Sequence, residues 1–244
     1  MGRWLLVALT ALFAASARAQ DSKSILAIPG SRHEIALQLG AFRPTARFGI
    51  NGVTGDKGER FGGTGFLFVI DYFHRVTSVL SAGLEGLHIN RGTYELKNLA
   101  FAAQFAGAST QVRGNTTALL ATLRLRPAGT GIRPYLLGGI GVHMTTMDAF
   151  MQSPPGTYWG GAFGPEMNVV QGGSTGLIGT VRGGIERTFA DNGTVGLEVG
   201  WIGIPAQRYS RTALGRGILP NDIVSRGDGL TVSAKFGYRF GGGY

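Results

Sequence analysis

The chain of 244 residues contains no cysteine, which excludes disulfide bonds and thiolate metal sites. Charged residues are also scarce, at 15% of the chain, a value that fits neither a disordered chain nor a helix bundle. After residue 20, no apolar run approaches the roughly 20 residues that a membrane-spanning helix requires. The sequence therefore does not predict a helical membrane protein.

Glycine is abundant instead, with 42 residues out of 244, against an average usage of about 7%. Hydrophobic residues make up 43% of the chain. Glycine in strands marks places where a neighbouring backbone or side chain leaves no room. The composition therefore predicts many strands that pack closely together.

The first residues read MGRWLLVALTALFAASARAQ, with basic Arg3 followed by an apolar run and the cleavage pattern Ala17-Arg18-Ala19. We predict a signal peptide over 1–19 and a short periplasmic segment over 20–32. An uncleaved anchor is the alternative, although the apolar run is short for a membrane span.

The net charge of +9 falls to +7 after cleavage, because two arginines and no acid leave. A basic balance can indicate nucleic-acid binding. In an exported chain we expect basic loops that face anionic lipid head groups, and no nucleic acid.

The stretch Leu230–Phe240, LTVSAKFGYRF, alternates strictly between apolar and polar residues. A period of two predicts a strand with one apolar and one polar face. About eleven residues is the length that a tilted strand needs to cross a bilayer, and aromatic residues gather at one end of its apolar face.

Seven further segments show a similar pattern. Together with Leu230–Phe240 they predict eight strands, at about residues 33–42, 64–73, 78–89, 115–126, 135–144, 176–187, 194–202 and 230–240. Leu87 and Ile89 blur the alternation in the third segment and suggest a bulge there. The segment 135–144 is apolar or glycine on both faces, so its orientation stays open.

The connections alternate between long and short, with four long loops at about 43–63, 90–114, 145–174 and 203–228. This asymmetry is typical of outer-membrane barrels. We therefore predict an all-β fold, an eight-stranded antiparallel up-and-down transmembrane β-barrel over 33–244, with four long extracellular loops. The alternative is a soluble, lipocalin-like ligand-binding barrel, with its apolar face inside and its charges outside.

The polar faces of the strands carry charges of both signs. We predict a charge network in the lumen, made of Glu34, Asp71, Glu85, Arg124, Arg182, Glu186, Glu198 and Lys235, with Arg126 and Arg239 as further bases. An eight-stranded barrel is just wide enough to be filled by such side chains, and buried charges must pair.

A hairpin centred on Asn192 would place Glu186 opposite Glu198, so a cation such as Arg182 or Lys235 is expected between them. Two interpretations stay open. The network is either a gate that opens when its ion pairs rearrange, or a packed polar core that holds the barrel shut.

The segment GGIERTFADNGTVGLEVGW (Gly183–Trp201) resembles the hairpin of strands six and seven in the OmpA/OmpX-type small outer-membrane barrels. RPYLLGGIGV (Arg133–Val142) is similar to the start of strand five in that family, and Leu230–Phe240 resembles its closing strand, although three glycines and Tyr244 follow here. The resemblance implies an acid–base network in the lumen that includes Glu186 and Glu198. It also implies insertion by the barrel-insertion machinery. Larger members append a peptidoglycan-binding domain, which we do not expect here.

Enzymatic motifs are weak. Residues 172–176 satisfy G-x-S-x-G but lack the preceding strand and following helix of a nucleophile elbow, and the histidines lack metal-ligand spacing. We predict no catalytic residue, no metal and no cofactor. The enzymatic alternative is a lipid A deacylase-like enzyme that uses His88 or His143 with a nearby serine.

The expected function is structural, a surface interaction or a narrow pore, in a monomer that contacts outer-membrane lipid and lipopolysaccharide. Candidate surface-binding residues are Phe101, Phe105 and Trp159, which are apolar for loop residues. Alternatively, these segments extend the barrel as further strand.

Overall fold

A computed structural model describes residues 31–45, 47–50, 59–60, 64–96, 109–127, 131–152, 166–189, 192–218 and 222–242. The predicted signal peptide, residues 20–30 and the candidates Phe101, Phe105 and Trp159 lie outside these ranges. In the described ranges, no helix is both long enough and apolar enough to span a membrane.

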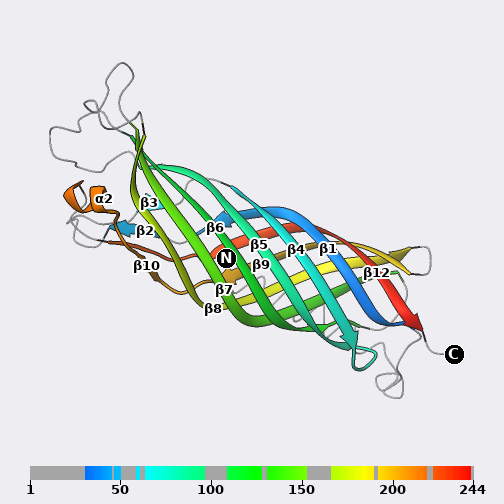
Figure 1. The fold of residues 1–244 in the computed structure, drawn as a ribbon. Helices are drawn as coiled ribbons and strands as arrows, with labels where there is room; N and C mark the ends of the chain where they lie inside the picture. The colour runs from blue at the N-terminus through cyan, green and yellow to red at the C-terminus, as the bar shows by residue number, and fades with distance from the viewer. Residues whose placement is uncertain are drawn as a thin grey trace.

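Eight strands form a closed barrel (Figure 1). They are β1 (Ser31–Pro44), β4 (Gly65–Arg75), β5 (Leu80–Leu96), β6 (Ser109–Leu125), β7 (Ile132–Gln152), β8 (Glu166–Phe189), β9 (Gly193–Gly203) and β12 (Gly229–Gly242). Each pairs antiparallel with the next in this series, and β1 closes the ring by pairing with β12. The predicted fold class is confirmed. β1 begins two residues earlier than predicted, at Ser31.

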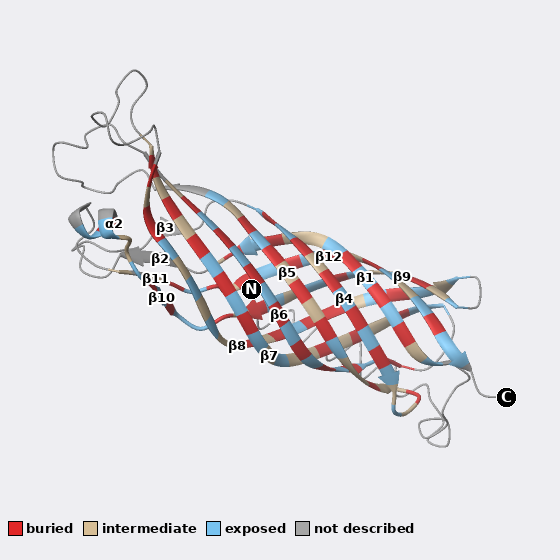
Figure 2. Ribbon diagram, viewed as in Figure 1, coloured by how far each residue is buried: buried red, intermediate tan, exposed pale blue. Residues whose placement is uncertain are grey.

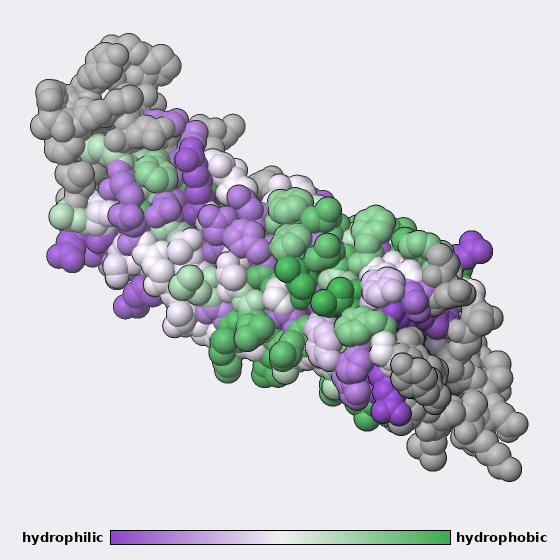
Figure 3. Space-filling model, turned by 45° about the vertical axis from the view of Figure 1, so that its right-hand side comes forward, coloured by the Kyte–Doolittle hydropathy of each residue, from purple (hydrophilic) through white to green (hydrophobic). Residues whose placement is uncertain are grey.

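Buried and exposed residues alternate along the strands, as Figure 2 shows. In β12 the odd-numbered polar positions from Thr231 to Lys235 are buried, whereas Val232, Phe236 and Tyr238 are more than half exposed. The outer wall therefore carries an apolar belt, visible in Figure 3. A soluble barrel would have the reverse arrangement, so the lipocalin-like alternative is wrong.

The barrel has two different ends, one on each side of the belt. We call the end with residues 76–79 and 192 the turn end, and the opposite end, where residues 204–218 and 222–228 lie, the loop end. β5 to β8 continue beyond the belt at the loop end (Figure 1). Much of the predicted loops 90–114 and 145–174 is therefore strand, and those loop boundaries were wrong.

The extension does not show the sequence pattern of a membrane strand, because its apolar residues face inward and its polar residues face outward. Within the belt, β7 points Ile140 and Val142 outward, but farther along it points Met147 and Met151 inward and Asp148 outward. Water replaces lipid outside the strand at this level, so the apolar side chains turn to the interior.

The other two long connections are also folded. Residues 43–63 supply β2 (Arg47–Ile50) and β3 (Glu59–Arg60), and residues 203–228 supply β10 (Gln207–Tyr209), α2 (Ala213–Ile218) and β11 (Ile223–Ser225). The four strands form a sheet in the order β10-β11-β2-β3. The backbone N–H of Thr212 donates to the Val169 carbonyl at 3.1 Å and so fixes this unit to β8.

The blurred alternation in the third predicted strand has a simple explanation. The pairing of β5 runs without a shift from Ser81 to Asn90, and the bulge lies farther on, between Asn90 and Thr93, where Gly92 has φ 76°. The alternation in residues 78–89 is blurred because Leu87 and Ile89 face the lumen, so the predicted bulge there was wrong.

The exposed belt predicts a strong position dependence for charge insertion. Leu197→Arg, near the middle of β9, should destabilise the barrel by about 2–4 kcal/mol in lipid vesicles, because the guanidinium would lie in hydrocarbon. Ile132→Arg, at the turn end of β7, should cost only about 0–1 kcal/mol. Urea unfolding would measure both, and equal costs would contradict the placement of the belt.

Candidate functional site

The candidate site is the lumen, which is divided into layers. Along β5 the inward side chains run from Glu85 through Leu87 and Ile89 to Arg91, towards the loop end. Other strands repeat this order of charged, apolar and polar residues, as β6 does from Arg124 through Leu120 to Thr116. The layers therefore follow from the sequence of each strand and its tilt.

The layer at the turn end, which we call the basal cluster, contains two carboxylates and five cations: Glu34, Glu186, Arg124, Arg126, Arg133, Lys235 and Arg239. Arg124 donates two hydrogen bonds to Glu34, of 2.6 and 2.9 Å. Arg126 bridges the two carboxylates, at 3.2 Å from Glu34 and 2.5 Å from Glu186. Each carboxylate is thus surrounded by several donors.

The next layer, the central cluster, is built on Arg182. Its guanidinium contacts Glu198 at 2.8 Å and also pairs with Glu85 across the barrel. Tyr135 donates to the second oxygen of Glu198 at 2.9 Å. A Cβ at Gly200, the partner of Arg182 in β9, would collide with the arginine side chain, so glycine is required there.

All eight predicted network residues have buried side chains. Seven of them belong to the two clusters, and Asp71 instead accepts a hydrogen bond from Gln38 at 2.6 Å. Each carboxylate of the two clusters forms an ion pair, as buried charges require, whereas Asp71 pairs with no cation in the described ranges.

One part of the prediction was wrong. Glu186 pairs with Gly196, and Glu198 pairs with Gly184, so the two carboxylates are not opposite each other. The pairing of Phe189 with Gly193 centres the hairpin one residue before Asn192. Of the two expected cations, Arg182 pairs with Glu198, whereas Lys235 lies 3.5 Å from Glu186 and closer to Glu34, at 2.8 Å.

A third layer consists of apolar side chains and was not predicted. We call it the apolar plug: Phe42, Leu67, Val69, Leu87, Ile89, Ala118, Leu120, Ile178, Ile202 and Ile204. It draws on six strands and on the residue that follows β9. Every member is at most 7% exposed. The plug therefore lies inside the barrel, between polar layers.

At the loop end, an upper cluster ties β10 to the barrel wall. The Gln207 amide donates to His143 Nε2 at 2.7 Å, so His143 Nδ1 carries the proton and donates to Thr145 at 3.0 Å. Burial raises the pKa of the Tyr209 phenol, which stays protonated and donates to Gln207 at 2.9 Å. Arg91 completes the cluster through Thr116, at 2.9 Å.

Several members of these layers were missed. Arg133 and Tyr135 lie on the strand whose orientation the sequence left open, and the side chain of each is buried. The alternation of Arg133, Tyr135 and Leu137 was the available signal. Gln207 and Tyr209 were hidden because they lie in a predicted loop.

In the described ranges, neither candidate histidine forms a hydrogen bond with a serine. His88 lies beside Thr117 at 3.0 Å, and the partners of His143 are Thr145 and Gln207. The G-x-S-x-G match lies inside the continuous strand β8 rather than at a strand-to-helix turn. No group of three or more metal-ligating residues occurs in the ranges described.

No family model matches this chain, and no curated protein matches its sequence. Among solved structures, it is similar to the outer membrane protein OprG from Pseudomonas aeruginosa, with 15% identity, a TM-score of 0.52, and coverage of 88% of this chain and 99% of OprG. The attachment invasion locus protein Ail of Yersinia pestis, solved in complex with the heparin analogue sucrose octasulfate, matches with 11% identity, a TM-score of 0.42, and coverage of 86% and 99%.

The outer membrane protease OmpT from Escherichia coli also matches, with 8% identity, a TM-score of 0.43, and coverage of 87% of this chain and 95% of OmpT. At these identities the likeness to OprG shows the fold alone. The resemblance to the OmpA/OmpX-type barrels is thereby confirmed at the level of the fold, which is that of a small outer-membrane barrel.

The central cluster predicts a charge-specific loss of stability. Arg182→Met should lower the free energy of unfolding by about 3–5 kcal/mol, because Glu85 and Glu198 would remain buried without their cation. Urea unfolding of the micelle-refolded protein would measure this loss. Arg187→Met, which removes an exposed arginine of the same strand, is the matched control.

The triple variant Glu85→Gln/Arg182→Met/Glu198→Gln removes all three charges and should regain much of the lost stability. If the single and triple variants were equally unstable, ion pairing would not be the reason for the loss.

Proposed function

We propose that this chain, which has the fold of the small outer-membrane barrels, is a closed and non-enzymatic barrel that presents a folded surface at its loop end. The observation that carries the proposal is the apolar plug, a layer of ten contacting side chains inside the lumen. The basal and central clusters below it fill the lumen with paired charges.

The plug separates this arrangement from a gated pore. An ion that leaves water for an apolar layer loses its hydration without gaining a partner, at a cost of many kcal/mol. Hydrophobic constrictions also exclude water itself. Rearrangement of the ion pairs in the basal cluster would therefore leave the barrel closed, which favours a packed polar core over a gate.

The loop end is built as a platform. β5 to β8 extend beyond the apolar belt, and the sheet β10-β11-β2-β3 with α2 is fixed beside them (Figure 1). The upper cluster locks β10 in place. A rigid platform that faces the outside supports a surface interaction, to which Phe101, Phe105 and Trp159 remain candidate contributors.

The remaining parts of the proposal follow from the sequence and the wall. Residues 1–19 act as the signal peptide, and residues 20–30 belong to the periplasmic segment. The barrel-insertion machinery places the chain in the outer membrane with its turn end in the periplasm. The protein is a monomer in that membrane. The apolar belt supports this location, because exposed apolar side chains require lipid around them.

Planar-bilayer conductance tests the closed barrel. The refolded protein should give no current steps, and Glu186→Gln should be equally silent because the plug is unchanged. Leu87→Ser combined with Leu120→Ser should admit water and produce steps. Heat-shifted gel mobility must show that each protein is folded.

Steps in the natural protein that change in Glu186→Gln would contradict the proposal. That result would identify the basal cluster as the gate of a narrow pore.

Lipopolysaccharide is the proposed lipid partner. Arg43 and Arg113 are exposed on outward positions near the loop end of their strands, where phosphates of the outer leaflet would lie. Arg43→Gln combined with Arg113→Gln should reduce the rise in melting temperature on adding lipopolysaccharide. Arg187→Gln, at the turn end, should leave that rise unchanged, and an equal loss would exclude a contact specific to the loop end.

A further inference from the structure

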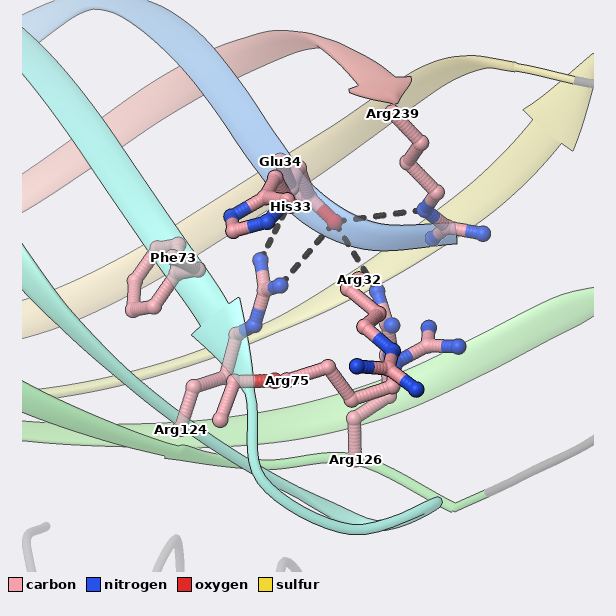
Figure 4. A pocket seen from close by; sticks show the side chains of 9 residues that line it. Arg32, His33, Glu34, Phe73, Arg75, Arg124, Arg126 and Arg239 are labelled. Atoms are coloured by element: carbon pink, nitrogen blue, oxygen red, sulfur yellow. Dashed lines mark hydrogen bonds and ion pairs between the residues drawn. The ribbon is translucent and has the colours of Figure 1, made fainter. Parts of the chain in front are cut away.

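The turn end of the lumen opens through a pocket lined mainly by arginines. Its polar lining comprises Arg32, His33, Glu34, Arg75, Ser81, Arg124, Arg126 and Arg239, together with Phe73. The pocket is small and partly open to solvent. Figure 4 shows Arg124, Arg126 and Arg239 converging on Glu34, with Arg32 and Arg75 beside them.

Charge in this region is strongly unbalanced. Among the lining residues of the pocket, five arginines face one carboxylate, that of Glu34. Two of these arginines, Arg32 and Arg75, form no ion pair with a carboxylate in the described ranges. Glu34 is already bonded to four cations, so it has little capacity left for these two arginines.

The position of Arg75 makes the imbalance costly. It is the last residue of β4 and is only partly exposed. Arg126 and Arg239 line the same pocket and carry the same charge. Like charges held together in a partly buried pocket require a counter-charge.

We propose that this pocket is a binding site for a small phosphate dianion, inorganic phosphate or a phosphate monoester, taken from the periplasm. Guanidinium groups match the oxygens of phosphate in a bidentate geometry. Arg75 and Arg32 lie at the open side of the pocket, where the ligand can reach them without displacing Glu34.

The orientation of the lining selects a free ligand over a lipid head group. Glu34, Arg124 and Arg239 occupy inward positions, so the pocket opens into the barrel mouth rather than onto the outer wall. A phosphodiester anchored in the leaflet would have to leave the membrane surface to enter. The site is independent of the closed lumen, because it lies on the periplasmic side of the plug.

Isothermal titration calorimetry with inorganic phosphate tests the proposal, using folded protein in zwitterionic micelles at constant ionic strength. One phosphate should bind per barrel with a saturable heat. Arg75→Gln should weaken binding about tenfold, because one charge-assisted hydrogen-bonding group is lost. Arg32→Gln is a second variant at the exposed edge of the pocket, and Arg187→Gln is the control with the same charge change.

Weakening in Arg75→Gln or Arg32→Gln, with unchanged binding in Arg187→Gln, would support the site. No saturable heat in the natural protein, or equal weakening in the control, would overturn it. A further titration in micelles that contain phosphatidylglycerol distinguishes the source of the ligand. Loss of phosphate binding there would show that a lipid head group occupies the pocket and would overturn the assignment to a free dianion.

Discussion

The whole structure depends on the narrowness of an eight-stranded barrel, whose lumen has to be filled by its own side chains. Every inward side chain must then either form an ion pair or hydrogen bond with another side chain or pack against one. Arg182 meets this constraint by spanning the lumen to Glu85 and Glu198, and Gly200 makes room for its stem. The abundance of glycine and the pairing of buried charges thus have the same physical cause.

The constraint is met differently at different heights, and function follows from this layering. Paired charges fill the turn end, apolar side chains fill the plug, and neutral hydrogen bonds around His143 close the loop end. A lumen filled only by charged side chains could open when its ion pairs rearrange. An apolar layer, however, contains no polar group that could replace the hydration of a passing ion. In the proposed closed barrel, the two mouths, one basic and one folded into a platform, are the places where other molecules can bind.

The sequence predicted the features that depend on period two. Leu230–Phe240 has the predicted faces, and the fold class follows from repeating that pattern eight times. Strand ends were missed where the environment changes from lipid to water, as between Val142 and Met147 in β7, because the apolar face changes sides there. The plug was missed because Leu87 and Ile89 look like irregularities in one strand until the neighbouring strands bring Leu67 and Leu120 beside them. The register error at Glu186 and Glu198 arose because the hairpin is centred one residue before Asn192.

The central claim is that the plug is dry. Water-edited solid-state NMR on methyl-labelled protein in lipid bilayers measures this directly, by the rate at which magnetisation passes from water to each methyl group. The account predicts that the methyl groups of Leu87 and Leu120 receive it as slowly as that of lipid-facing Leu197. Fast transfer to Leu87 and Leu120, with slow transfer to Leu197, would reveal a water-filled lumen and contradict the account.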